Sequence, residues 1–228
     1  MKLNELQKKR QRDNEIKEGL ALGLLVIAGF IGTLFALPVL ATIAESFLVI
    51  ERARVTVEDD ELEARLITEG LLIPTEGSEG AFGYGILTED GNASLVAHTH
   101  RGVLDSEDQS FIEDPSWHNH FVKLGDDVEQ CGEDQGVIDI TWQSPGEVEI
   151  NNDNGARISD VPTGEFEGGH SITGEDLSMT LGEDVSNVVS FRLDPVFDKE
   201  DGLQAVCVTD IMPAEDIDVN SIAQPQQR

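Results

Sequence analysis

From about residue 82 onward, apolar and polar residues alternate with a period of two, which is the pattern of a β-strand with one buried face. Turn-forming sequences such as "SPG" and "NNDNG" separate the alternating segments. About eight short strands at this spacing predict an all-β domain, an antiparallel β-sandwich of the immunoglobulin-like kind. The alternation is clearest in five segments: 137–143, 147–150, 177–181, 189–193 and 203–209.

Residues 20–44 form a run of 25 residues without a charged side chain. A helix of this length, rising ~1.5 Å per residue, covers the ~30 Å hydrocarbon core of a bilayer. Six lysines and arginines precede the run and three arginines follow it as far as Arg65, so the positive-inside rule places the N-terminus in the cytoplasm. A cleaved signal peptide is the alternative, but its apolar core is normally about 7–15 residues long. We therefore expect a single-pass helix in the cell membrane, with the C-terminal domain outside.

The strand pattern and the uncharged run together divide the chain into five parts. Between them, the periodicity does not decide whether the chain forms a stalk or a first strand, and we expect disorder at the C-terminal end. The predicted parts are a basic cytoplasmic tail (1–19), a transmembrane helix (20–44), a stalk or first strand (45–80), an extracytoplasmic β-sandwich (81–212) and a disordered tail (213–228).

The charge of the chain is strongly negative and lies almost entirely in the outer part. The net charge is −30, and residues 51–228 carry nine basic and forty acidic side chains. Such a surface repels phosphate backbones, which excludes nucleic acid as a partner. Because the acidic residues are scattered, they indicate a solvated surface that faces outward. The partners that we expect are membrane lipid, through residues 20–44, and other membrane or envelope proteins.

The two cysteines of the chain, Cys131 and Cys207, both belong to the outer part. An even number of cysteines in an oxidising compartment favours a disulfide over free thiols, which would be open to oxidation. We therefore predict a Cys131–Cys207 disulfide.

Four of the five histidines lie between residues 98 and 120, as two His-x-His pairs. Residues two apart in a strand point to the same face, so His98 projects together with His100, and His118 together with His120. If the two strands pair, the four imidazoles converge. They would then suit zinc in a tetrahedral site or copper in a tetragonal one.

Further oxygen or nitrogen ligands are available near the histidine pairs. The alternative interpretation is that the histidines are hydrogen-bonded polar residues at a half-buried rim of the sheet. In that case they have no metal role. The candidates for additional ligands are His170, Asp105, Glu107 and Asp108.

A β-sandwich with a His-x-His strand and a disulfide is similar to Cu/Zn superoxide dismutase. The resemblance rests on His98 and His100, and the later ligands do not follow that family's spacing, so its activity is not implied. No nucleophile or acid–base pair is recognisable, so enzyme action is not expected. The predicted function is a membrane-anchored extracytoplasmic domain that binds copper or zinc. The alternative is a structural or interaction subunit of a membrane or cell-envelope complex.

Overall fold

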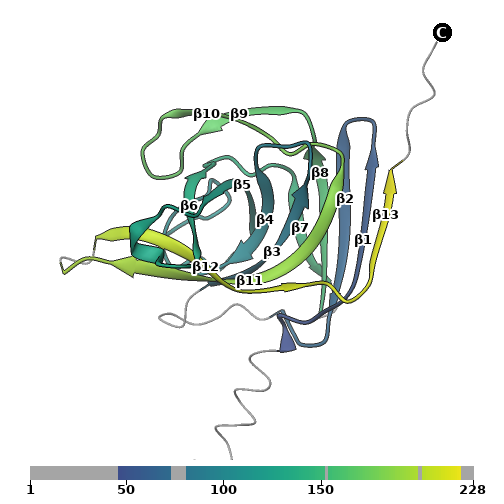
Figure 1. Ribbon diagram of the computed structural model, residues 1–228, viewed down its shortest axis with the longest axis horizontal. Coiled ribbons are helices and arrows are strands. Elements are labelled where there is room, and N and C mark those ends of the chain that lie inside the picture. The colour runs from purple at the N-terminus through teal and green to yellow at the C-terminus, as the bar shows by residue number, and fades with distance from the viewer. Residues whose placement is uncertain (1–45, 73–80, 152–153, 200–201, 222–228) are drawn as a thin grey trace, which may run out of the picture. The chain divides into compact units, whose positions relative to one another are not determined.

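The computed structural model describes residues 46–72, 81–151, 154–199 and 202–221 (Figure 1). These residues form strands and one short 3-10 helix, η2 (Glu129–Cys131), which confirms the all-β prediction. The predicted transmembrane segment, 20–44, lies outside the described residues. Among those that are described, no helix is long and apolar enough to cross a membrane.

Six of the strands close into a barrel, in the order β11-β12-β6-β5-β4-β3 (Figure 1). The barrel closes because β11 pairs along its length with β12 on one side and with β3 on the other. An immunoglobulin-like sandwich would instead consist of two open sheets, so this part of the prediction is corrected. The barrel strands are β3 (Ala81–Thr88), β4 (Ser94–Thr99), β5 (His118–Gly125), β6 (Gln135–Ile140), β11 (Val185–Phe197) and β12 (Leu203–Pro213).

A five-stranded sheet lies beside the barrel, in the order β13-β1-β2-β8-β7. It is mixed, because β13 runs parallel to β1 while the other neighbours are antiparallel. The segment left open as a stalk or a first strand contributes β1 and β2 to this sheet, and the segment expected to be a disordered tail contributes β13. The strands are β1 (Ile50–Glu58), β2 (Glu61–Thr68), β7 (Glu147–Asn151), β8 (Gly155–Pro162) and β13 (Ile217–Ser221), and a separate hairpin comprises β9 (Glu165–Gly169) and β10 (Asp176–Thr180).

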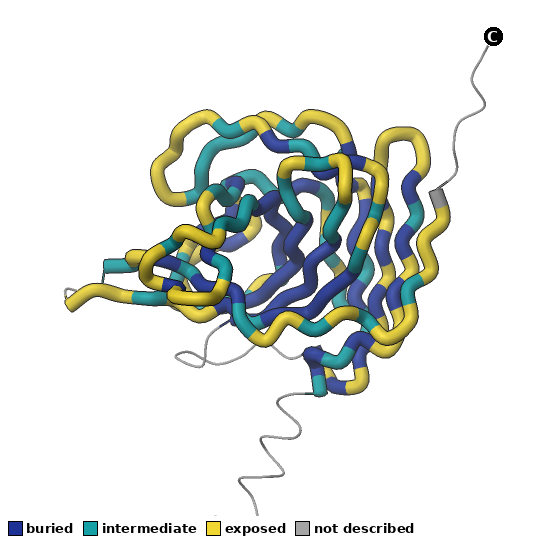
Figure 2. Tube along the Cα trace, viewed as in Figure 1, coloured by how far each residue is buried: buried dark blue, intermediate teal, exposed yellow. Residues whose placement is uncertain are grey.

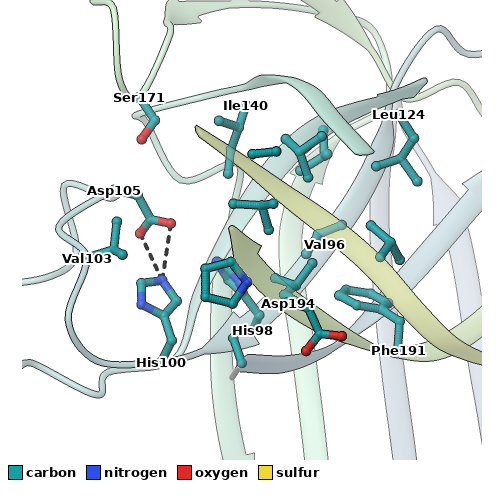
Figure 3. A pocket seen from close by; sticks show the side chains of 18 of the residues that line it. Val96, His98, His100, Val103, Asp105, Leu124, Ile140, Ser171, Phe191 and Asp194 are labelled. Atoms are coloured by element: carbon teal, nitrogen blue, oxygen red, sulfur yellow. Dashed lines mark hydrogen bonds and ion pairs between the residues drawn. The ribbon is translucent and has the colours of Figure 1, made fainter. Parts of the chain in front are cut away.

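Both faces of β3, β4 and β5 are buried, which divides the apolar interior into two cores (Figure 2). One face packs in a cluster with the five-stranded sheet, and Leu95 and Phe121 belong to it. The opposite face points into the barrel, where Val96 and Phe191 lie near each other (Figure 3). The alternation along each strand therefore separates the residues that hold the sheet from those that line the barrel.

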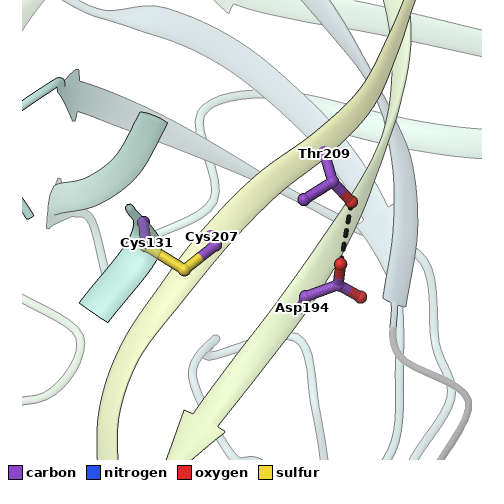
Figure 4. Close-up of a disulfide and its surroundings, with 4 residues drawn as sticks. All are labelled: Cys131, Asp194, Cys207 and Thr209. Carbon is purple, nitrogen blue, oxygen red and sulfur yellow. Dashed lines mark hydrogen bonds between the residues drawn. A yellow bond between two sulfur atoms is a disulfide. The ribbon is translucent and has the colours of Figure 1, made fainter. Parts of the chain in front are cut away.

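The predicted disulfide between Cys131 and Cys207 is confirmed, with an S–S distance of 2.01 Å (Figure 4). Cys131 ends η2 and Cys207 lies on β12, so the bond fastens the helical turn to the barrel wall. Two residues further along β12, the Thr209 hydroxyl donates to Asp194 on β11 at 2.8 Å.

Candidate metal centre

His118 and His120 lie on β5, and His98 lies on the neighbouring antiparallel strand β4, with His100 directly after its last residue. In this register, His98 lies opposite His118, and Val96 lies opposite His120. The ring centroid of His98 is 4.5 Å from that of His118 and 4.9 Å from those of His100 and His120. The four imidazoles therefore lie together inside the barrel, as the strand pattern predicts.

Asp105 reaches the histidines from the loop between β4 and β5. Its Oδ1 lies 3.3 Å from Nε2 of His118 and 3.8 Å from Nε2 of His120. The ligand atoms of His98, Asp105, His118 and His120 all lie within 4.8 Å of one another, and all four residues are buried. This set, called here the His–Asp cluster, has the donors and the spacing to hold a metal ion.

His100 is not one of the four cluster residues, but it forms a hydrogen bond with the carboxylate of Asp105. Its Nε2 lies 3.1 Å from each oxygen of Asp105 (Figure 3). A ring N–H in this position donates to a carboxylate, which accepts only, so Nε2 of His100 carries the proton. In metal sites, residues that do not bind the metal often orient a ligating carboxylate through such hydrogen bonds.

The tautomers of two cluster histidines are set by backbone carbonyls. Nδ1 of His118 lies 2.7 Å from the carbonyl oxygen of Ser116, and Nδ1 of His120 lies 2.6 Å from that of Thr141. A carbonyl accepts only, so each Nδ1 donates its proton, and Nε2 of the neutral ring carries a lone pair. Both lone pairs therefore lie toward Asp105, in the arrangement usual for metal-ligating histidines.

The charges at the cluster follow from burial and hydrogen bonding. Burial lowers the pKa of His98 well below its ordinary value, and the neighbouring histidines add to this effect. Burial likewise lowers the pKa of His120 to about 4, although Asp105 opposes the shift. Burial acts to raise the pKa of Asp105, but the hydrogen bond from His100 holds it well below its usual range. At neutral pH, the neutral imidazoles of His98 and His120 therefore face an ionised carboxylate.

Three of the additional ligand candidates lie outside the His–Asp cluster. Nδ1 of His170 accepts hydrogen bonds from the backbone amides of Ile172 and Thr173. Glu107 and Asp108 are exposed, and both carboxylates accept hydrogen bonds from Ser144. Of the four candidates, only Asp105 therefore belongs to the cluster.

Gln109 is a positioning residue that the sequence did not point to. Its buried side chain accepts a hydrogen bond from the backbone amide of Asp105 at 3.0 Å and donates one to the carbonyl of Asp114 at 3.1 Å. It thereby fixes the turn that carries the carboxylate. A glutamine four residues after an aspartate has no recognisable metal-site spacing, so no pattern could have found it.

We expect the metal-free protein to lose stability as the pH falls from about 6.5 to about 4. The unfolded His120 binds its proton near ~6.5, whereas the folded residue binds it only near pH 4. Between these values the unfolded chain holds more protons, so the free energy of unfolding falls with pH, by about 3 kcal/mol for this residue. Urea unfolding at pH 7 and pH 4.5, with chelator present, measures the difference.

The variant His120→Leu serves as the control, because it has no such proton to bind. Its free energy of unfolding should fall less than that of the wild type over the same pH interval. Equal losses in the two proteins would contradict the assignment to His120.

Comparisons of the chain with protein-family models, with curated proteins and with solved structures found no match. The class of this protein is therefore described by its fold and its candidate site. It is an all-β barrel protein with a buried cluster of three histidines and one aspartate that can hold a metal ion.

Proposed function

We propose that the chain binds one divalent transition metal ion, zinc or copper, through the His–Asp cluster. The observation that carries this proposal is the contact between two acceptors. Nε2 of His118, with its proton on Nδ1, lies 3.3 Å from the ionised Oδ1 of Asp105. Two lone pairs at this distance repel each other in a medium of low dielectric constant, and a cation between them removes the repulsion.

The donor set favours zinc or copper over the hard cations. Three imidazole nitrogens and one carboxylate oxygen suit both metals, whereas calcium and magnesium prefer oxygen ligands. Asp105 contributes one negative charge to the cluster, and a divalent ion would more than balance it. Compared with the four histidines expected from the sequence, Asp105 takes the place of His100 among the proposed ligands.

We further propose that this metal is held outside the cell, by a domain anchored in the membrane through residues 20–44. The uncharged run and the basic residues before it support the anchor and its orientation. The Cys131–Cys207 bond supports an oxidising compartment. A tethered domain of this kind would store a metal ion or pass it on.

The alternative is that the domain is a structural or interaction subunit with no metal role. The histidines would then have to stabilise the fold. However, both ring nitrogens of His98 are buried without a hydrogen-bond partner among the described residues. A structural histidine in that position costs stability, so the burial argues for the metal.

Metal content of the variant Asp105→Asn tests the proposal. The asparagine keeps the shape of the side chain and removes the only ionised ligand, so affinity should fall at least about 100-fold, more than outer-shell changes usually cost. The full chain is dialysed against a mild chelator at pH 7.5, and bound zinc and copper are measured. We expect close to one ion per chain in the wild type and almost none in the variant.

Asp108→Asn is the matched control, since Asp108 belongs to the same loop but is exposed and outside the cluster. It should retain the metal. Negligible metal in all three proteins would refute the proposal, and a stable set of co-purifying membrane subunits would then support the alternative.

A further inference from the structure

The interior of the barrel contains a cavity of about 880 Å³ (Figure 3). This volume lies within the range of roughly 300–1,000 Å³ that is typical of small-molecule sites. The walls are mostly apolar and come from all six barrel strands. Among the residues that form them are Val96, Val122, Leu124, Ile140, Phe191 and Val208.

The cavity and the metal centre adjoin each other, because the same strand faces build both. On β4, Val96 and His98 point inward and both line the cavity. On β5, Val122 follows His120 on the inward face and lines it as well. His100 and Asp105 also line the cavity, so its polar end is the His–Asp cluster. A molecule in the cavity would therefore have one end beside the metal.

The same lining includes polar atoms that have no partner. Nε of Arg101 and Oγ of Ser171 are buried and have no hydrogen-bond partner among the described residues, and both side chains line the cavity. His98, 2 % exposed, also presents unpartnered ring nitrogens. Arg101, Ser171 and His98 therefore place polar side chains along a cavity whose walls are mostly apolar.

We propose that this cavity binds an apolar monocarboxylic acid, with its carboxylate at the metal and Arg101 and its hydrocarbon part inside the barrel. The inference rests on the proposed metal site. A divalent ion together with Arg101 attracts an anion, and a carboxylate can accept from Arg101 while it ligates the metal. A dianion fits less well, because Glu113 and Asp194 also line the walls. A molecule with no polar group would offer nothing to accept a hydrogen bond from the Arg101 guanidinium.

Calorimetric titration with decanoate tests the inference on the zinc- or copper-loaded full chain. We expect saturable binding at one site, which weakens when the metal is removed with chelator. The affinity for shorter acids of the same series should fall about fourfold for each methylene group removed, because a shorter chain buries less apolar surface. 1-Decanol, which has the same chain without the charge, should bind at least about tenfold more weakly.

Two variants separate the roles of the cavity and of its polar end. Leu124→Trp fills the cavity at a half-buried position away from the cluster, so it should keep the metal and lose decanoate. If it fails to fold, Val208→Phe on β12 makes the same test. Arg101→Gln should weaken decanoate at least tenfold, whereas the exposed Arg65→Gln should not.

The outcomes of the metal and decanoate experiments are distinguishable. Metal binding without saturable decanoate binding would overturn the inference and leave the metal site standing. Equal binding to loaded and metal-free protein would also overturn it, because the carboxylate would then not reach the metal. Absence of metal from the wild type would refute the proposed function itself. Decanoate affinity that is independent of chain length would exclude the cavity as the site.

Discussion

His98→Leu is expected to lose tight metal binding while its metal-free form becomes more stable than the wild type by about 1 kcal/mol. Both ring nitrogens of His98 are buried without a partner in the described part of the chain. Burial of such a group costs free energy, and a leucine of similar size removes that cost without leaving a large cavity. A residue kept for stability would give the opposite result.

The metal-dependent part of this prediction is the larger effect. At a free metal concentration about 1,000 times the dissociation constant, binding stabilises the wild type by about 4 kcal/mol. For a domain of this size, that corresponds to a rise of roughly 8–16 °C in the melting temperature. Zinc or copper should raise the melting temperature of the wild type by this amount and leave His98→Leu almost unchanged.

The matched control is His170→Leu, because His170 lies outside the His–Asp cluster. It should show the full metal-dependent rise. Destabilisation of metal-free His98→Leu by more than 1 kcal/mol, or a metal-dependent rise equal to that of the wild type, would contradict the prediction.

Removal of the disulfide should have an effect of similar size. The bond closes a loop with a sequence separation of 76 residues, which on the loop-entropy account stabilises the fold by about 4–5 kcal/mol. The double variant Cys131→Ala and Cys207→Ala should therefore melt roughly 9–18 °C lower than the wild type. Thermal unfolding followed by circular dichroism measures this.

The wild type treated with a strong reductant is the comparison for the double variant, and both should melt at similar temperatures. Metal content should remain close to that of the wild type at low temperature, since neither cysteine belongs to the His–Asp cluster. A loss of less than 1 kcal/mol would contradict the loop-entropy estimate.

The strands and the histidine faces were predictable because both depend on a local period of two. That period alone places His98 and His100 on one face, and antiparallel pairing of the two strands brings His118 and His120 beside them. The disulfide was predictable for a different reason, because the chain contains only two cysteines.

The barrel and the carboxylate of the site could not be predicted in the same way. Closure depends on β11 pairing with β3, about a hundred residues earlier in the chain, and no local pattern encodes such a pairing. Three acids of one loop had been named as candidate ligands, and only Asp105 is turned inward. Its selection depends on the hydrogen bonds of Gln109 and His100, which exist only in the folded structure.

The four proposed ligands come from two kinds of structure, which has a consequence for the rate of metal exchange. The three histidines stand on paired barrel strands, whereas Asp105 stands on a loop. Strand pairs in a closed barrel separate rarely, but a loop can open by itself. If the cluster holds a metal as proposed, we therefore expect the carboxylate to engage an incoming ion last and to leave it first. The residence time of the metal should then depend on how fast this one loop opens. A partner protein that binds the loop would control release of the metal without any change in the histidines.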